Sequence, residues 1–260
     1  MPWDGIISSE GSGGNLNRII FYACGKKMST RPVASNRALV REISSRLEAL
    51  PVADAESIRA VRREFSKRLA AASAKDLCAV ALGLLNNPTA RHRLTAYELV
   101  SHHRPALASL EFRDLARLGE GIDNWAAVDT FAIYLAGPVW RQGQISDARV
   151  KSWARSTDRW WRRAALVATV PLNNKTRGGN GDPARTLAIC QMLVADRDDM
   201  VVKAMSWALR ELAKRQPSAV EVFLKDYEET VAPRVLREVR NKLTTGLKNP
   251  PGPVGHAPDV

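Results

Sequence analysis

Trp125 and Asp129 stand four residues apart in an otherwise apolar stretch of the chain. Four residues is slightly more than one helical turn, so both side chains would project from one face. An unpaired carboxylate in such surroundings costs on the order of several kcal/mol, so we expect Asp129 to be paired, protonated or used in chemistry. An anion beside an aromatic ring suits a cationic or electron-poor ligand. The alternative is structural: Asp129 caps a helix or forms a salt bridge to a neighbouring one.

The charge of the chain points to a polyanionic partner. The formal net charge is +12 and the pI is about 10.1, an excess typical of proteins that bind nucleic acid. Arg155, Arg159 and Arg163 follow one another at intervals of four, with Arg162 adjacent, and would share one helical face. A second basic group, near the C-terminus, comprises Arg234, Arg237, Arg240, Lys242 and Lys248. The two groups predict a track for phosphates, although a charge run is also typical of a solvated face.

Helical periodicity sets the expected fold. The second predicted helix has apolar residues at Ile58, Val61, Phe65 and Leu69, the stripe of an amphipathic helix. The predicted helices span 35–49, 54–71, 74–86, 89–103, 106–118, 123–136, 146–156, 158–170, 184–195, 198–214, 217–228 and 231–246. Capping signals at Ser73, Asp123-Asn124, Asp158 and Asp198 mark helix starts, and Pro138 is expected at a break after 136. Such a string favours an all-α, HEAT-like α-solenoid whose concave face is basic; a compact helical bundle is the alternative. We expect one domain over 34–248, with disordered tails at 1–33 and 249–260, and Met28 as a possible alternative start.

Several other chemistries find no support in the sequence. His102 and His103 are adjacent and would diverge on a helix, and three widely spaced cysteines give neither a zinc nor a disulfide pattern. We expect no metal and no cofactor. No apolar run approaches the roughly 18 residues that a membrane-spanning helix needs. The odd, widely spaced cysteines fit reduced thiols, so we expect an intracellular protein, cytoplasmic or associated with a bacterial nucleoid when acting. We also expect a monomer.

One glycine-rich segment, 172–183, lies between two predicted helices. Lys175 and Arg177 stand beside its glycines and could touch a phosphate, but the segment does not match a phosphate-loop pattern. A mobile connection between helices is the favoured interpretation.

Three segments in order resemble the AlkC/AlkD-type DNA alkylation-repair family, closest to the AlkD branch. They are Trp125-x-x-x-Asp129, then Arg163-Ala-Ala-Leu after a tryptophan pair, then Lys203-Ala-x-x-Trp207-x-Leu-Arg210. The resemblance covers roughly residues 55–248. It implies a HEAT-like solenoid that hydrolyses the N-glycosidic bond of cationic alkylated purines, such as 3-methyladenine and 7-methylguanine, in double-stranded DNA.

The resemblance also implies roles for individual residues. Asp129 would be the catalytic carboxylate, Trp125 and Trp207 would flank the deoxyribose of the lesion, and Arg163 would bind the backbone nearby. Further DNA contacts are expected from Arg159, Arg162, Lys203, Arg210, Arg234, Arg237, Arg240, Lys242 and Lys248. The protein would be a monofunctional DNA glycosylase of base excision repair. A non-catalytic DNA-binding relative and a HEAT-type protein scaffold remain the alternatives.

Overall fold

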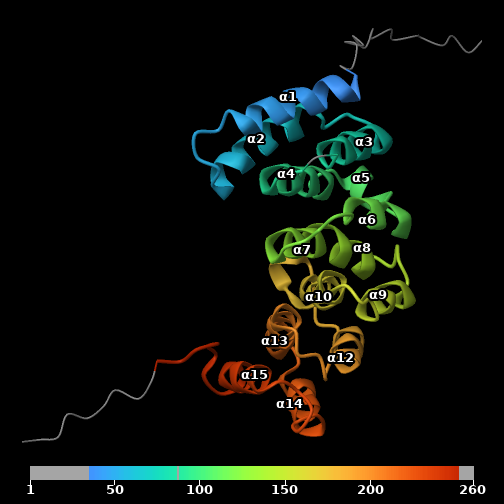
Figure 1. Ribbon diagram of the computed structural model, residues 1–260. Helices are drawn as coiled ribbons and strands as arrows, with labels where there is room; N and C mark the ends of the chain where they lie inside the picture. Colours follow the sequence, from blue (N-terminus) through green and yellow to red (C-terminus); the bar gives the residue numbers. More distant parts are fainter. Residues whose placement is uncertain (1–34, 87, 252–260) are drawn as a thin grey trace, which may run out of the picture. The chain divides into compact units, whose positions relative to one another are not determined.

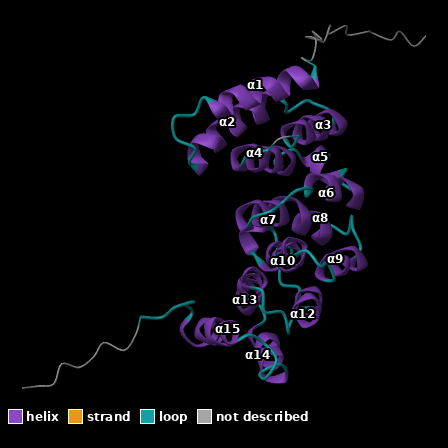
Figure 2. Cartoon of the chain, viewed as in Figure 1, coloured by secondary structure: helices purple, strands orange, loops and turns teal. Residues whose placement is uncertain are grey.

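A computed structural model describes residues 35–86 and 88–251 (Figure 1). Every regular element in this part of the chain is helical (Figure 2), which confirms the predicted all-α class. The elements are α1 (Asn36–Glu48), α2 (Ala55–Arg68), α3 (Ala74–Leu84), α4 (Ala90–Ser101), α5 (Arg104–Ala108), α6 (Phe112–Leu118), α7 (Trp125–Phe131), the π-helical η1 (Ala132–Ala136), α8 (Gly137–Arg141), α9 (Asp147–Ala154), α10 (Arg159–Val167), α11 (Val170–Asn173), the 3₁₀ turn η2 (Lys175–Arg177), α12 (Pro183–Met192), α13 (Asp199–Ala213), α14 (Pro217–Asp226) and α15 (Pro233–Thr245).

The helices stack in two parallel series, as expected for a solenoid. In one series α2 packs on α4, α4 on α7, α7 on α10, α10 on α13 and α13 on α15. Helices α3, α9, α12 and α14 back this series on the other side (Figure 1). Aromatic side chains join successive layers: the ring centroids of the buried Tyr97 and Phe131 lie 5.9 Å apart, and those of Phe131 and the partly buried Trp161 also 5.9 Å. The core is therefore continuous along the stack, because each layer buries the apolar face of the next.

Side-chain caps at the predicted positions define where several helices begin. Ser73 accepts a hydrogen bond from the amide of Asp76 at 3.1 Å, and Asn124 accepts one from Ala127 at 3.0 Å. Asp158 and Asp198 cap α10 and α13 in the same manner. Each cap satisfies an amide that has no partner within its own helix, which is worth about 1 kcal/mol.

Two predicted helices are divided in the structure. The segment 106–118 forms α5 and α6, because Glu111 and Asp114 make a capping box that starts a new helix at Phe112. The segment 158–170 ends at Val167, and Pro171 lies in the first turn of the separate short helix α11.

A third predicted helix, 123–136, is longer than expected, because Pro138 does not end it. The chain continues from α7 through η1 into α8, where the amide of Gly137 bonds to the carbonyl of Ala132 five residues earlier. Pro138 has no N–H, and its ring would meet the carbonyl of the preceding turn of an α-helix. A wider π turn before the proline accommodates that ring and keeps the helix running to Arg141.

The glycine-rich segment 172–183 is tied to its surroundings. The amide of Gly179 bonds to the carbonyl of Asn174 at 2.9 Å, and Asn174 Nδ2 bonds to Glu211 of α13 at 2.9 Å. These bonds argue against the mobile connection expected from the sequence. No helix between residues 35 and 251 is long and apolar enough to cross a membrane. The predicted tails lie outside the described residues, except for 249–251.

Gly137 allows α8 to approach α11 closely, and its replacement should destabilise the stack. A Cβ atom there would lie 2.7 Å from both the Ala168 carbonyl oxygen and Pro171 Cγ. Alanine favours a helix over glycine by about 1 kcal/mol, but such overpacking costs typically 1–3 kcal/mol. Because one clashing atom is a backbone oxygen that cannot turn aside, the cost should lie in the upper half of that range. We therefore expect Gly137→Ala to lower the free energy of unfolding by roughly 1–2 kcal/mol in a urea titration.

The control is Gly143→Ala. Gly143 has φ 77° and open space around its added Cβ, so this variant reports backbone strain alone. A Gly137→Ala protein as stable as the wild type would contradict the close approach.

Candidate active site at the Asp129–Arg163 pair

Trp125 and Asp129 share α7, as the spacing predicts, but their surroundings differ. Trp125 is the first residue of the helix and is 58% exposed. It is the only aromatic side chain among the large hydrophobic residues exposed between residues 35 and 251. Asp129, one turn later, is half-buried. An exposed indole beside a half-buried carboxylate is more typical of a binding surface than of a core.

Arg163 of α10 holds the Asp129 carboxylate with two parallel hydrogen bonds. Its Nε donates to Oδ1 and its Nη2 donates to Oδ2, each at 2.8 Å. The third nitrogen, Nη1, donates to the carbonyl of Met200 at 2.5 Å. The Arg163 side chain is only 7% exposed and that of Asp129 15%. One guanidinium therefore connects α7, α10 and α13 at a single point.

Burial and the charge of Arg163 act on the pKa of Asp129 in opposite directions. Burial raises the pKa of the Asp129 carboxyl, and the hydrogen bonds and charge of Arg163 oppose the rise without cancelling it. The carboxylate is thus less stabilised than it would be in water, despite its counterion. A carboxylate has about four lone-pair positions, and Arg163 occupies two of them. The remaining positions can accept a water molecule or face a second cation.

The structural alternative considered for Asp129, a salt bridge to a neighbouring helix, is therefore present. It does not exclude a chemical role, because the pair is partly accessible and adjoins the exposed Trp125. Sequence analysis expected Arg163 to contact the DNA backbone. The structure commits three of its donors to protein partners, so its observed role is to position Asp129; contact with DNA stays a prediction.

Helix α13 contributes the second aromatic residue. Met200, Lys203, Trp207 and Arg210 follow one another at spacings of three or four, so they share the face of α13 that meets Arg163. Trp207 is half-buried against the core. It stands two turns, roughly 10 Å, beyond Met200 along the helix. Its placement opposite Trp125 stays a prediction.

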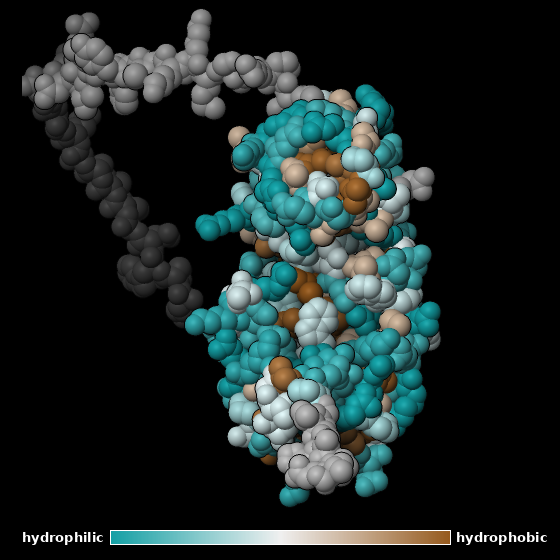
Figure 3. Space-filling model, turned by 90° about the vertical axis from the view of Figure 1, so that its left-hand side faces the viewer, coloured by the Kyte–Doolittle hydropathy of each residue, from teal (hydrophilic) through white to brown (hydrophobic). Residues whose placement is uncertain are grey.

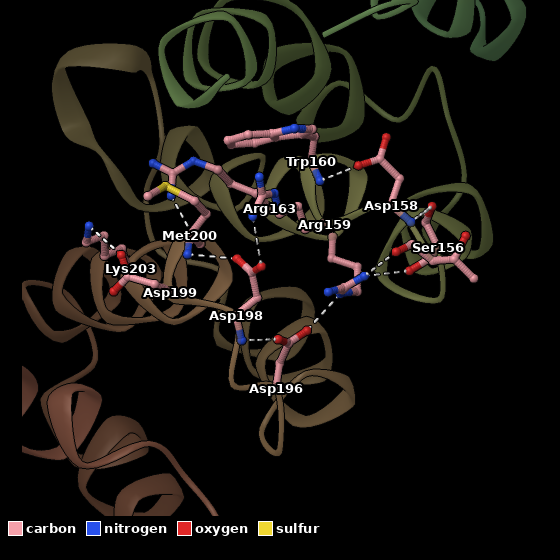
Figure 4. A network of polar contacts seen from close by, with 12 residues as sticks. Ser156, Asp158, Arg159, Trp160, Arg163, Asp196, Asp198, Asp199, Met200 and Lys203 are labelled. Atoms are coloured by element: carbon pink, nitrogen blue, oxygen red, sulfur yellow. Dashed lines mark hydrogen bonds and ion pairs between the residues drawn. The ribbon is translucent and has the colours of Figure 1, made fainter. Parts of the chain in front are cut away.

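The predicted basic face of Arg155, Arg159 and Arg163 is wrong as a single helical face. Arg155 closes α9, and α10 begins only at Arg159 after the Asp158 cap. Arg163 points into the stack. Arg159 lies 3.4 Å from Asp198, with its guanidinium 4.8 Å from the centroid of Trp160 (Figure 4).

Most of the other predicted DNA-binding residues form ion pairs, and three of them, Lys203, Arg234 and Arg240, pair with exposed carboxylates. Arg162 pairs with Asp196 at 2.7 Å. Lys203 pairs with Asp199 at 2.6 Å (Figure 4). On and just beyond α15, Arg234, Arg240 and Lys248 pair with Asp199, Glu228 and Glu238, and Lys242 bonds to the carbonyl of Gly246. Exposed pairs contribute about 0–1 kcal/mol each, so a phosphate can replace the carboxylate at small cost.

Besides Lys242, two of the predicted residues, Arg210 and Arg237, have no ion pair within the described ranges. Arg237 is exposed on α15. Arg210 donates to the Ser206 hydroxyl at 3.2 Å, and burial lowers the pKa of its guanidinium. A half-buried arginine without a bonded carboxylate is suited to an external anion.

The face that carries α2, α4, α7 and α13 is mainly hydrophilic. Figure 3 views it directly and shows paler and apolar side chains along its middle, between hydrophilic flanks. That this face is concave and basic throughout stays a prediction. In the described part of the chain, no group of three His, Cys, Asp or Glu side chains is arranged to hold a metal ion.

The fold and the site together define a helical-repeat protein with a buried arginine–carboxylate pair beside an exposed tryptophan. A family model described as "DNA alkylation repair enzyme" matches residues 53–243, and the chain belongs to that family. The match covers α7, α10 and α13 and therefore every residue of the site. No curated protein matches the sequence significantly.

The partnership of Asp129 with Arg163 was missed from the sequence, although both residues were singled out. They are 34 positions apart, and their contact depends on how α7 and α10 stack. The sequence signal that could have indicated the pair was a lone carboxylate, Asp129, on one mostly apolar helix. Its counterpart was Arg163, which lies on the apolar side of another amphipathic helix.

Replacement of Arg163 should destabilise the protein far more than replacement of its neighbour Arg159. Arg163→Met leaves the Asp129 carboxylate buried without a counterion, which costs about 3–5 kcal/mol. Arg159→Met breaks an exposed pair worth about 1 kcal/mol or less. Guanidinium chloride titrations of both variants measure the difference.

A double variant tests whether the penalty comes from the uncompensated charge. Arg163→Met combined with Asp129→Asn should recover part of the loss, because no charge is then left buried. Equal destabilisation by Arg163→Met and Arg159→Met would show that the buried pair is not the structural link described here.

Proposed function

We propose that this protein is a monofunctional DNA glycosylase of the AlkD branch, which releases cationic alkylated purines from duplex DNA. The observation that carries the proposal is the Asp129 carboxylate. It is held by two hydrogen bonds from Arg163, is only 15% exposed, and adjoins the exposed indole of Trp125. Membership in the DNA alkylation repair family supplies the partner and the class of lesion.

The chemistry of such lesions suits this site. A purine alkylated at N3 or N7 already carries a positive charge, so it leaves without a strong general acid. Positive charge then develops on the sugar as an oxocarbenium ion, as in glycoside hydrolysis. A preorganised carboxylate stabilises that charge, and this contribution can reach several kcal/mol. The free lone pairs of Asp129 can also orient the attacking water.

Burial of Asp129 makes this stabilisation specific to the transition state. Because burial leaves the carboxylate poorly solvated, a second cation gains more from it than from a carboxylate in water. Arg163 keeps the group oriented without occupying all of its lone pairs. The site is therefore arranged for charge stabilisation.

Two tryptophans supply further attraction for a cationic sugar. The face of an indole is negative, and each contact with a cation contributes about 1–2 kcal/mol when water is excluded. Trp125 has the exposure needed for direct contact. Trp207, on the face of α13 that meets Arg163, would supply the second ring after the DNA binds.

The surroundings of Lys203 support a monofunctional reaction. A lyase step needs a free amine that attacks the sugar as a Schiff base. The Lys203 Nζ lies 2.6 Å from the Asp199 carboxylate in an i, i+4 ion pair and points along α13. We therefore assign Lys203 to DNA binding.

Substitution of the carboxylate tests the proposal. Asp129→Asn keeps the size of the side chain and removes the charge, so release of 7-methylguanine from methylated duplex DNA should fall by about 100-fold or more. Released bases are quantified by chromatography under single-turnover conditions. Asp226→Asn, an exposed residue on α14, makes the same chemical change away from the site and should leave the rate unchanged.

The result also separates the alternatives. Equal base release by wild type and Asp129→Asn would reject Asp129 as the catalytic group. Tight DNA binding by a wild-type protein that releases no base would favour a non-catalytic DNA-binding relative. Absence of DNA binding at about 0.15 M salt would favour a protein scaffold.

A further inference from the structure

Arginines from two distant parts of the chain contact Tyr134 of the π-helical segment η1, and a third supports one of them. Arg59 of α2 donates from Nη2 to the Tyr134 hydroxyl at 3.4 Å. From the glycine-rich segment, the guanidinium of Arg177 lies 4.9 Å from the centroid of the Tyr134 ring. Arg141 of α8 donates to the carbonyl of Arg177 at 2.7 Å. We name Arg59, Tyr134 and Arg177 the Tyr134 cluster.

A buried carboxylate positions the first of these arginines. Glu98 of α4 is 1% exposed, and it accepts from Arg59 Nε at 2.8 Å and from Arg62 Nε at 3.1 Å. Burial raises the pKa of the Glu98 carboxyl, but its interactions with Arg59, Tyr134 and Arg62 lower that pKa by more. The pKa of Glu98 is therefore lower than usual. Glu98 binds Nε of Arg59 and the Tyr134 hydroxyl accepts from Nη2, and the Arg59 side chain remains 37% exposed.

The second arginine is positioned by the backbone around it. The amide of Arg177 bonds to the carbonyl of Asn174 at 3.1 Å within the turn η2. Gly178, at φ 79°, ends that turn and lets Arg141 pass so close that a Cβ on Gly178 would clash with its guanidinium. The glycine-rich segment thus holds Arg177 over the Tyr134 ring.

The charges around Tyr134 do not balance. Arg59, Arg62, Arg141 and Arg177 bring four positive charges, and Glu98 is the one carboxylate bonded to any of them. Arg141 and Arg177 form no ion pair with any described residue. Elsewhere on the surface, most of the predicted DNA-binding cations are paired with carboxylates. A local excess of partly accessible guanidinium groups favours binding of an external anion. Two neighbouring guanidinium groups can together hydrogen-bond to the oxygens of one phosphate.

We propose that the Tyr134 cluster binds a backbone phosphate of the duplex, next to the lesion site. The anion is identified as DNA through the proposed function, on which this inference rests. Tyr134 is five residues after Asp129 on one continuous helix, or roughly 7 Å along its axis. That distance is about two base-pair steps of duplex DNA. The cluster would extend the interface from α10, α13 and α15 back to α2.

Salt dependence of binding to unmodified duplex DNA tests the inference independently of base release. Each lost phosphate contact should reduce the slope of log K against log salt by about 0.9. Arg177→Ala should lower the slope by that amount and weaken binding about 10-fold. Arg177→Lys keeps the charge, so it should retain the slope and lose only part of the affinity. Arg113→Ala on α6 is the matched control, because Arg113 is 81% exposed and pairs only with Glu111.

The possible outcomes are distinguishable. An Arg177→Ala protein with the slope and affinity of the wild type would overturn the phosphate site, whether or not the wild type releases bases. A reduced slope in a protein that releases no base would support the site and reject the glycosylase. Arg59→Ala should reproduce the Arg177→Ala result; if it unfolds instead, the Arg177 variants decide, because the Arg177 side chain makes no ion pair in the fold.

Discussion

The guanidinium of Arg163 is the constraint on which the site depends. It joins the Asp129 carboxylate of α7 to the Met200 carbonyl of α13 from a position on α10, and it is almost fully buried. Three consecutive layers of the stack thereby meet at one planar group. Because a guanidinium offers its donors in fixed directions, it sets the orientation of the carboxylate as well as its distance. After the π turn that follows α7, Gly137 lets the same continuous helix approach Ala168 and Pro171, just beyond α10.

The same interaction connects stability with chemistry. A buried ion pair contributes little net stability, since desolvation offsets most of the attraction. Here the pair holds a partly buried carboxylate whose lost hydration is only partly replaced by Arg163, as the raised pKa of Asp129 indicates. The surface cations around it have a different character. Lys203, Arg234 and Arg240 are paired with exposed carboxylates, which a phosphate backbone can displace at small cost. Under the proposed function, the residues that would bind DNA are thus separate from the carboxylate that would act in catalysis.

Sequence patterns within one or two helical turns correctly predicted the features that depend on interactions between near neighbours in the chain. The helical class, the capping residues Asn124, Asp158 and Asp198, and the shared face of Trp125 and Asp129 follow from spacing within one or two turns. Predictions from single residues were wrong where the surrounding structure accommodated a residue or divided a helix. Pro138 was expected to end a helix but is accommodated by a π turn, and Arg155 was expected on one face with Arg159 across what proved to be a helix break. The partner of Asp129 and the arginines around Tyr134 come from distant segments, so only the stacking of helices reveals them.

Selectivity between charged and neutral lesions tests the central claim most directly, namely that Asp129 acts by stabilising positive charge. Purified protein is incubated with duplexes that contain either 7-methylguanine or uracil, and released base is measured over time. Because the site offers a carboxylate and no strong acid, the cationic base should be released and the neutral one should stay bound to its sugar. Release of uracil as fast as 7-methylguanine would contradict the account, because a neutral base needs leaving-group activation that this mechanism does not supply.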